Sequence, residues 1–499
     1  MSGARSLFAP HALLPEGWAR DVLLSWDERG ALVQVTPHAA APAGVPVAAG
    51  PLLPGMPNLH SHAFQRGMAG LTEYRSDAVS EDSFWSWRQL MYRFALRLQP
   101  AQLEAMAYGL YVEMLEAGYT AVCEFHYVHH HTDGRPYADD AELALAVLRA
   151  ARRAGIGLTL LPVLYQTSGF GAQPPGESQR RFIRSTDSML KLLARLQPLC
   201  DAQGARLGLA PHSLRAVPPD ALRAVLAGLN AIDPAAPIHI HIAEQTQEVQ
   251  DCLTWSGQRP VAWLLDHAPV DARWCLVHAT HMDDDEYRRA AATGAVAGLC
   301  PSTEANLGDG IFDLPRWVAA GGEADDPHAQ HFVSSLPPEG AAPALGRPGG
   351  GAWGIGSDSH VTVNAAEELM LLEYSQRLAT RRRNVAASAA HAEVATAMTL
   401  AAVRGGAQAS GRPLAGLAVG QQADLVVLDS AHRALAGLSA PQQLAGHVFA
   451  SHRTSAVHSV WVGGVPRVTG ARHADHAAAE AGWLAARQQL LAEQVPAAS

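Results

Sequence analysis

The sequence predicts an α/β fold, in which a TIM-like (β/α)8 barrel is combined with a small β-sandwich domain built from both chain ends. Strand-like and helix-like segments alternate through the middle of the chain, a pattern typical of a parallel sheet covered by helices. Eight such units favour a closed barrel over an open sheet. The 499 residues are enough for a barrel of about 250 residues and an accessory domain.

Eight strands and the helices between them define the predicted barrel. The first strand is the apolar run before His60, and helical periodicity is clearest at residues 101–117, 139–154, 220–231 and 365–380. The other strands are expected at residues 119–125, 156–164, 207–210, 238–242, 274–277, 295–299 and 353–356. In such barrels the active site lies at the carboxyl ends of the strands.

Short β segments occur near both ends of the chain, and each group is too small to bury a core alone. We therefore expect them to pair in one composite β domain of residues 1–54 and 412–474. The barrel would span residues 55–411, and residues 475–499 would form a C-terminal helix. Residues 321–351 are rich in Gly and Pro, which predicts a surface insertion. We favour an inert insertion over a mobile lid.

The composition indicates a globular protein that does not bind polyanions. Lys and Arg number 37 against 47 Asp and Glu, a net charge of −10, and no basic tract points to nucleic acid or to an anionic membrane. The five cysteines are odd in number and widely spaced, which predicts buried free thiols. An apolar signal sequence and a run of about 18 apolar residues are both lacking. We expect a soluble cytoplasmic protein without membrane partners.

A candidate metal site begins at His60-Ser61-His62, directly after an apolar run. In an extended strand alternate side chains share one face, so these two histidines could bind one metal ion. The chain has 24 histidines, and the pair therefore needs partners from distant strands. The run of histidines at 129–131 is expected to be a solvated loop rather than a second metal site.

Polar side chains end nearly every predicted strand. In residues 238–242 isoleucines alternate with two histidines; we expect His239 to be a hydrogen-bonded core residue and His241 to be a ligand. Asp358 could complete the ligand set, or it could cap the helix that begins near Asn364. Three histidines and one aspartate leave a position open for water, as catalytic zinc requires. The other strand-end residues are Glu124, His126, Tyr127, His212, Arg215, Glu244, His278, His281, Ser302, Thr303, Glu304 and His360.

Four of these motifs belong together, namely His60-x-His62, His241-x-x-Glu244, His278 and Ser357-Asp358. They resemble the amidohydrolase superfamily, and within it the branch of mononuclear deaminases. Binuclear relatives bridge two metals with a carboxylated lysine, but the only lysine here, Lys191, lies in a helical stretch. Longer strings are similar to the bacterial formimidoylglutamate deiminase family, and these are MPNLHSHAFQRGMAG, SFWSWRQLMYR, EFHYVHH, PHSLRAV, HIHIAEQ, CPSTEANLGDG and GIGSDSH.

The resemblance implies a role for each matching residue. The metal ligands would be His60, His62, His241 and Asp358. The substrate would be bound by Gln65, Arg88, Tyr127, His212 and Arg215. The chemistry would be assisted by Glu244, as base and then acid, together with His278 and Asp358. The resemblance also implies one Zn²⁺ per subunit and a homodimer; Fe²⁺ accepts the same ligands.

The implied reaction is the hydrolytic deimination of N-formimino-L-glutamate to N-formyl-L-glutamate and ammonia in histidine degradation. This substrate carries two carboxylates, and planar guanidinium groups match carboxylates in a bidentate manner. Arg88 and Arg215 are therefore suitable partners. Arg88 could instead be a packed surface residue, since Trp85 and Trp87 flank it.

Two other functions are compatible with parts of the pattern. A deaminase of another amine or amidine, of purine, pyrimidine or triazine type, would keep the metal site, but a neutral ring would leave the two arginines unpaired. A barrel that has lost catalysis and serves as a binding protein would be expected to lack ligands, whereas the full set is present. The deiminase is the function that the sequence favours.

Overall fold

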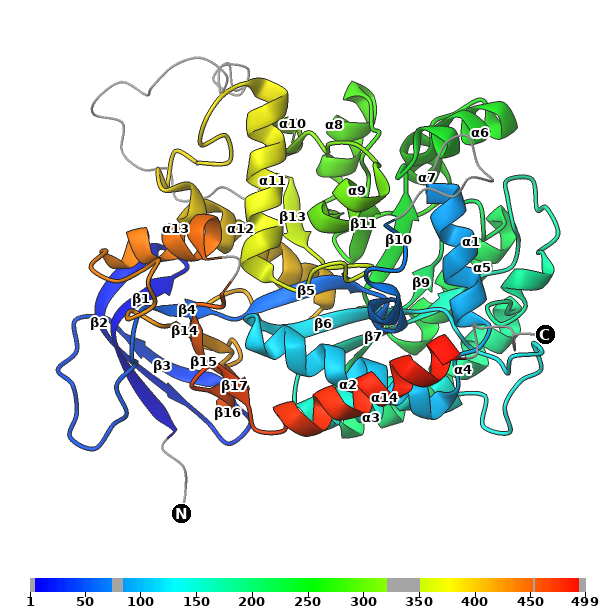
Figure 1. Cartoon of the computed structure of the whole chain (residues 1–499). Coiled ribbons are helices and arrows are strands. Elements are labelled where there is room, and N and C mark those ends of the chain that lie inside the picture. The colour runs from blue at the N-terminus through cyan, green and yellow to red at the C-terminus, as the bar shows by residue number, and fades with distance from the viewer. Residues whose placement is uncertain (1–4, 74–83, 321–350, 452–453, 493–499) are drawn as a thin grey trace.

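The computed structural model describes residues 5–73, 84–320, 351–451 and 454–492. A barrel of parallel strands surrounded by helices forms its larger part, and a second sheet lies at one side of the barrel (Figure 1). The barrel strands are β5 (Met56–Ser61), β6 (Tyr119–His126), β7 (Gly157–Leu164), β8 (Arg206–Leu207), β9 (Ala210–Pro211), β10 (Ile238–Ile242), β11 (Trp274–His278), β12 (Val296–Leu299) and β13 (Ala352–Ile355).

The barrel strands form two parallel groups that are joined at both of their edges. One group contains β5 to β9 and the other contains β10 to β13. Leu209, between β8 and β9, forms a parallel bridge to Ile238 of β10, and Ser61 of β5 forms one to Asp358, which follows β13. Since β8 and β9 together occupy the place of one predicted strand, these bridges close the ring. The predicted (β/α)8 barrel is confirmed.

Helices cover the outside of the barrel and connect its strands (Figure 1). The predicted helices at 101–117, 139–154, 220–231 and 365–380 correspond to α2, α3, α5 and α11, with ends that differ by at most three residues. The described helices are α1 (Phe84–Ala95), α2 (Pro100–Glu116), α3 (Glu142–Ala154), α4 (Thr186–Ala202), α5 (Pro219–Ile232), α6 (Thr246–Ser256), α7 (Pro260–His267), α8 (Asp284–Ala292), α9 (Pro301–Leu307), α10 (Leu314–Ala320), α11 (Ala365–Thr380), α12 (Val394–Ser410), α13 (Ala440–Ala450) and α14 (His476–Ala492), with short 3₁₀ helices η1 (Ala63–Met68) and η2 (Glu177–Gln179).

Both ends of the chain contribute to the second sheet, which has the strand order β17-β16-β15-β14-β4-β1-β2-β3. β4 joins the two halves, because it pairs antiparallel with β14 and parallel with β1. The domain boundaries at residues 54 and 412 stay a prediction. The strands of this sheet are β1 (Ser6–Leu14), β2 (Gly17–Trp26), β3 (Leu32–Thr36), β4 (Leu52–Pro54), β14 (Leu425–Leu428), β15 (Val457–Val462), β16 (Val465–Thr469) and β17 (Arg472–His473).

The C-terminal helix α14 packs along α2 (Figure 1). Its Arg487 donates hydrogen bonds to the carbonyl oxygens of Gly67, at 3.1 Å, and Ala69, at 2.7 Å, and thereby holds the segment that follows the first barrel strand. The predicted insertion at 321–351 lies outside the described residues except for Gly351.

Helix α12 crosses the amino-terminal end of the barrel, opposite the strand ends that carry the polar residues. It packs on β5 and β13, and a Cβ atom at Gly405 would overlap the main chain of Trp353. The carbonyl oxygen of Ala409 accepts a hydrogen bond from Nε2 of His239 at 2.8 Å. His239 is therefore a hydrogen-bonded core histidine, as predicted.

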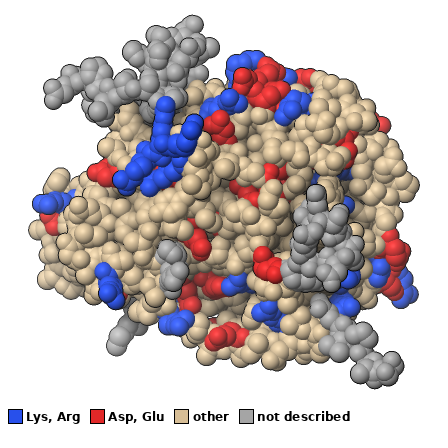
Figure 2. Space-filling model, turned by 45° about the horizontal axis from the view of Figure 1, so that its top comes forward, with Lys and Arg blue, Asp and Glu red and all other residues tan. Residues whose placement is uncertain are grey.

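The structure also bears on the expectations drawn from composition. All five cysteines are buried free thiols, which confirms the prediction. Among the described residues, no helix combines the length and the apolar character needed to cross a bilayer. On the face shown in Figure 2, acidic and basic side chains are interspersed over a largely uncharged surface, apart from one compact group of basic side chains.

We expect Gly405→Ala to lower the free energy of unfolding by about 3 kcal/mol, because the new methyl group overpacks the contact between α12 and β13. Gly482→Ala in α14 is the matched control. No atom lies within 4 Å of its Cβ position, and removing a helical glycine should stabilise the protein by about 1 kcal/mol. Urea unfolding followed by circular dichroism measures both effects, and a Gly405→Ala protein as stable as wild type would contradict this packing.

Candidate functional site

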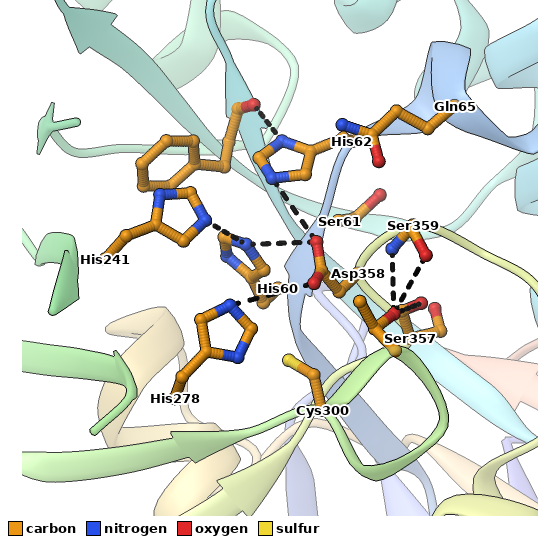
Figure 3. Close-up of polar contacts among 12 residues, drawn as sticks. His60, Ser61, His62, Gln65, His241, His278, Cys300, Ser357, Asp358 and Ser359 are labelled. Carbon is orange, nitrogen blue, oxygen red and sulfur yellow. Dashed lines mark hydrogen bonds and ion pairs between the residues drawn. The ribbon is translucent and has the colours of Figure 1, made fainter. Parts of the chain in front are cut away.

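Four side chains converge at the carboxyl ends of the barrel strands (Figure 3). Ring nitrogens of His60, His62 and His241 and a carboxylate oxygen of Asp358 all lie within 4.8 Å of one another. Nε2 of His60 is 3.0 Å from Nε2 of His241 and 3.4 Å from Oδ1 of Asp358, which is 3.3 Å from Nε2 of His62. The structure therefore brings together the four residues predicted as metal ligands.

The spacing and the protonation of these groups fit a metal ion. Donor atoms that share one zinc ion at about 2.0–2.2 Å lie about 3 to 4 Å apart, and the three separations above fall in this range. Nδ1 of His62 donates to the carbonyl oxygen of Phe125 at 2.9 Å, and Nδ1 of His241 donates to that of His212 at 3.2 Å. These hydrogen bonds leave both Nε2 lone pairs directed at the centre of the cluster.

Burial keeps the three histidines neutral. It lowers the pKa of His60 to about 3 and also lowers the pKa values of His62 and His241. Burial acts in the opposite direction on Asp358, but the neighbouring histidines, His60 first, outweigh it and hold the pKa of this carboxyl below its usual value. Neutral imidazoles and one ionised carboxylate are the forms that bind a divalent cation.

The backbone around Asp358 is shaped by contacts between the first and last barrel strands. The amide of Asp358 donates to the carbonyl oxygen of His60 at 3.0 Å, and Asn58 donates to Oγ of Ser357 at 2.6 Å. Asp358 has a φ of 43°, and strained residues of this kind cluster at functional sites. Asp358 does not cap α11, since Asn364 accepts the amides of Ala366 and Glu367.

Glu244 and His278 face each other beside the cluster. Nε2 of His278 is 3.8 Å from Oε1 of Glu244 and 3.8 Å from Oδ2 of Asp358. Burial raises the pKa of Glu244 to about 7. Burial would lower the pKa of His278, but the surrounding carboxylates, Glu244 first, raise it to about 10. Glu244 is thus able to exchange a proton near neutral pH, while His278 carries a positive charge.

Glu304 orients His278, a contact that the sequence does not reveal. Its Oε1 is 3.2 Å from Nδ1 of His278 and accepts the amide of Cys300 at 2.8 Å. The sequence places Ser302, Thr303 and Glu304 at the end of the seventh strand and indicates no partner for Glu304. In the structure Glu304 fixes the ring of His278, which ends the neighbouring strand.

A cavity of about 560 Å³, including its opening to solvent, lies above the cluster. All five residues predicted to bind substrate line it: Gln65, Arg88, Tyr127, His212 and Arg215. Nε2 of Gln65 donates to the hydroxyl of Tyr127 at 2.8 Å. Burial, with Arg215 next, holds the pKa of His212 well below its usual value, so this ring is neutral.

The two predicted arginines approach the same aromatic side chain. The guanidinium carbon of Arg88, in α1, lies 4.4 Å from the ring centroid of Trp85, and that of Arg215, which follows β9, lies 5.8 Å from it. Arg215 is buried and Arg88 is partly exposed. One wall of the cavity therefore carries two positive charges.

Two further tyrosines of the cavity were not predicted from the sequence. Tyr92 and Tyr165 line it, and both hydroxyls accept from Nε2 of Gln179, at 3.4 and 2.6 Å. Tyr165 directly follows β7, so the rule that strand ends carry function could have identified it. Tyr92 lies one helical turn after Arg88, where only the folded helix reveals the shared face.

The histidine run is not the solvated loop that the sequence predicted. His129 and His130 are buried, and their Nε2 atoms donate to the carbonyl oxygens of Val163 and Ile183 at 2.9 and 2.8 Å. The prediction was wrong because these side chains satisfy buried main-chain acceptors of neighbouring segments. Within the described part of the chain, no group of candidate metal ligands includes this run.

Comparisons with known proteins agree with this geometry. The family model described as "Amidohydrolase family" matches residues 52–467, and one described as "Formimidoylglutamate deiminase HutF, N-terminal domain" matches residues 4–45. The chain is 50% identical over 469 residues to the formimidoylglutamate deiminase of Pseudomonas aeruginosa, covering 94% of this chain and 96% of that protein. It is 27% identical to the 8-oxoguanine deaminase of the same organism, over 75% of this chain and 74% of that protein.

Solved structures show the same fold. An amidohydrolase from Brucella melitensis has a TM-score of 0.86 at 46% identity and covers 98% of this chain and 100% of its own. An adenosine deaminase from Xanthomonas campestris with bound zinc has a TM-score of 0.73 at 21% identity, with 98% of both chains covered. The chain belongs to the amidohydrolase family, and within it to the family of the Pseudomonas formimidoylglutamate deiminase.

Proposed function

We propose that the protein is a zinc-dependent deiminase that converts N-formimino-L-glutamate and water to N-formyl-L-glutamate and ammonia in histidine degradation. The observation that carries this proposal is one cavity that joins a three-histidine, one-aspartate cluster and Glu244 to two arginines. The 50% identity to a formimidoylglutamate deiminase supports it. The protein is a hydrolase that acts on carbon–nitrogen bonds.

Glu244 would move the proton in this reaction. His60, His62, His241 and Asp358 would hold the zinc ion, which when bound would supply Lewis-acid activation of water and of the formimino group. With a pKa raised to about 7, Glu244 can accept a proton from the attacking water and then donate it to the departing nitrogen. One carboxylate can perform both steps because its two protonation states are close in energy at neutral pH.

His278 would stabilise the charge that develops on the attacking oxygen. Glu304 accepts from its Nδ1 side, which leaves Nε2, at 3.8 Å from both Glu244 and Asp358, directed into the site. A fixed, positively charged donor of this kind costs no reorganisation during the reaction. Asp358 would ligate the metal and share the proton with Glu244.

The arginines would select a substrate with two carboxylates. A pair of unit charges at 4 Å is worth about 4 kcal/mol at an effective dielectric constant of about 20, before the cost of desolvation. A substrate without the carboxylates would leave the terminal guanidinium nitrogens of Arg88 and Arg215 without an anionic partner in the cavity, which disfavours it. Gln65, Tyr127 and His212 supply uncharged hydrogen-bonding groups next to them.

A deaminase of a neutral base is the second candidate, since 8-oxoguanine deaminase and methylthioadenosine deaminases are among the relatives at 23–27% identity. The metal cluster alone does not distinguish these substrates. The two arginines near Trp85 favour the acyclic dicarboxylate, because a neutral ring offers them no counter-charge.

The proposal also covers the compartment, the oligomeric state, the metal and the domain arrangement of the enzyme. We infer a cytoplasmic homodimer with one metal ion per subunit, with Zn²⁺ favoured over Fe²⁺, and an arrangement of a barrel at residues 55–411 and a β domain at 1–54 and 412–474. The family resemblance supports the dimer and the metal, and the five buried free thiols suit a reducing compartment.

Ammonia release from N-formimino-L-glutamate by the zinc-loaded protein tests the function. Adenosine, guanine, cytosine and N-formimino-L-aspartate are assayed in parallel, and the product is identified by mass. We expect efficient turnover of N-formimino-L-glutamate alone, with N-formyl-L-glutamate as product. Turnover of a neutral base, or none of the dicarboxylate at full zinc occupancy, would contradict the proposal.

We expect Arg215→Ala to lower kcat/KM for N-formimino-L-glutamate at least a hundredfold, because the substrate loses a charged partner inside the cavity. Zinc content, measured by atomic emission, should stay at the wild-type level, since Arg215 is not a ligand. A variant with full activity would remove Arg215 from the binding site.

We expect kcat/KM to fall about tenfold per pH unit below pH 7. Glu244 must be ionised to act as a base, and burial raises its pKa from 4.5 to about 7, so the active form is present above pH 7 and is lost as the pH falls. Glu244→Gln should retain zinc and lose at least a thousandfold in kcat. A flat profile down to pH 5, or near-normal turnover by the variant, would mean that another residue carries the proton.

A further inference from the structure

Glu248 is a buried carboxylate that the proposed mechanism does not use. It lies in the first turn of α6, four residues after Glu244, and its side chain is fully buried. Oε2 accepts the backbone amide of Glu244 at 3.1 Å. Oε1 lies 4.0 Å from Nε of Arg215. A single carboxylate therefore contacts both the proton-transfer residue and the arginine predicted to bind substrate.

Capping of α6 explains only half of this arrangement. An acidic side chain in the first helical turn commonly accepts an amide that precedes the helix and favours the positive end of the helix dipole. That accounts for Oε2 of Glu248. Among the described residues, neither Oε1 of Glu248 nor Nε of Arg215 has a hydrogen-bond partner. The two atoms form an ion pair at 4.0 Å.

Arg215 needs such a counter-charge. It is only 7% exposed, and an isolated buried guanidinium is costly. Burial acts to lower the pKa of Arg215, but Glu248, and then Glu244, raise it above its usual value. Because Glu248 lies on the Nε side, it leaves the two terminal nitrogens to form a parallel fork with a carboxylate.

We propose that Glu248 is a positioning residue, which holds the Arg215 guanidinium ready for a substrate carboxylate and fixes it relative to the main chain of Glu244. This inference rests on the proposed function, in which Arg215 binds the substrate. Glu248 then supports both the residue that would recognise a substrate carboxylate, Arg215, and the residue that would transfer the proton, Glu244. A substrate bound to Arg215 would therefore lie at a fixed position relative to Glu244.

Glu248→Gln tests the role of the charge. Glutamine has the same shape and keeps an acceptor for the amide of Glu244, so a capping role alone would leave kinetics unchanged. We expect KM for N-formimino-L-glutamate to rise at least tenfold, with kcat reduced less than threefold and zinc content unchanged. In an Arg215→Ala background the same substitution should change kcat/KM less than threefold, because the group that it positions is gone.

Glu286→Gln is the matched control. Glu286 is also buried, accepts the amides of Val261 and Ala262 at 3.0 Å, and pairs with Arg259 at 2.7 Å, away from the cavity. We expect this variant to lose stability but to keep KM within twofold of wild type. An equal rise of KM in both variants would overturn the inference, since it would show a general effect of removing a buried charge.

The outcomes separate this inference from the proposed function. If the wild-type enzyme releases no ammonia from N-formimino-L-glutamate, the proposed function fails. Two results with an active wild-type enzyme would overturn only the role of Glu248. One is a KM of Glu248→Gln within twofold of wild type. The other is an equal loss of kcat/KM when Glu248→Gln is introduced into the wild-type and the Arg215→Ala enzymes. Should Glu248→Gln not fold, Glu248→Asp retains the charge at a greater distance from Arg215. It is expected to raise KM at least threefold, and an unchanged KM would overturn the inference.

Discussion

The parallel pairing of Ser61 with Asp358 is the contact on which the site depends, because it joins the first barrel strand to the last. It sets His60 and His62 beside the carboxylate of Asp358, although about 300 residues of chain separate them. Asn58 reinforces the contact through its hydrogen bonds with Ser357, at 2.6 and 3.2 Å. The contact that joins the first barrel strand to the last therefore also brings His60 and His62 to Asp358.

Burial then assigns a protonation state to each group at this centre. The histidines that face the cluster lose their charge, whereas the carboxylate among them keeps its own because the histidines surround it. Beside the cluster, the effect of burial on Glu244 outweighs the effect of neighbouring positive charges, and the pKa of this carboxyl is raised to about 7. The same buried environment thus keeps the ligand histidines neutral and raises the pKa of the Glu244 carboxyl into the range where it can exchange protons at neutral pH.

The sequence was informative wherever a function depends on local spacing. His60 and His62 share a strand face, and Asp358 ends a glycine-flanked strand, so their convergence followed from the barrel rule. β1 is less evident from the sequence, because Pro10 and His11 interrupt its apolar run and its antiparallel pairing with β2 is seen only in the fold. The long-range roles of Glu248 and Glu304 are not evident from the sequence, since each contacts a residue that ends or follows a different strand, Arg215 and His278 respectively. The boundaries of β8 and β9 depend likewise on the approach of Leu209 to Ile238.

The central claim is that one metal ion is bound by three histidines and one aspartate in the closed barrel. Anomalous diffraction from crystals of the zinc-loaded protein, recorded on both sides of the zinc absorption edge, tests it most directly. The account predicts one peak per chain, at about 2.0–2.2 Å from Nε2 of His60, His62 and His241 and from an oxygen of Asp358. Two peaks in the barrel, or a single peak on the other side of His278 next to Cys300 and Glu304, would contradict it.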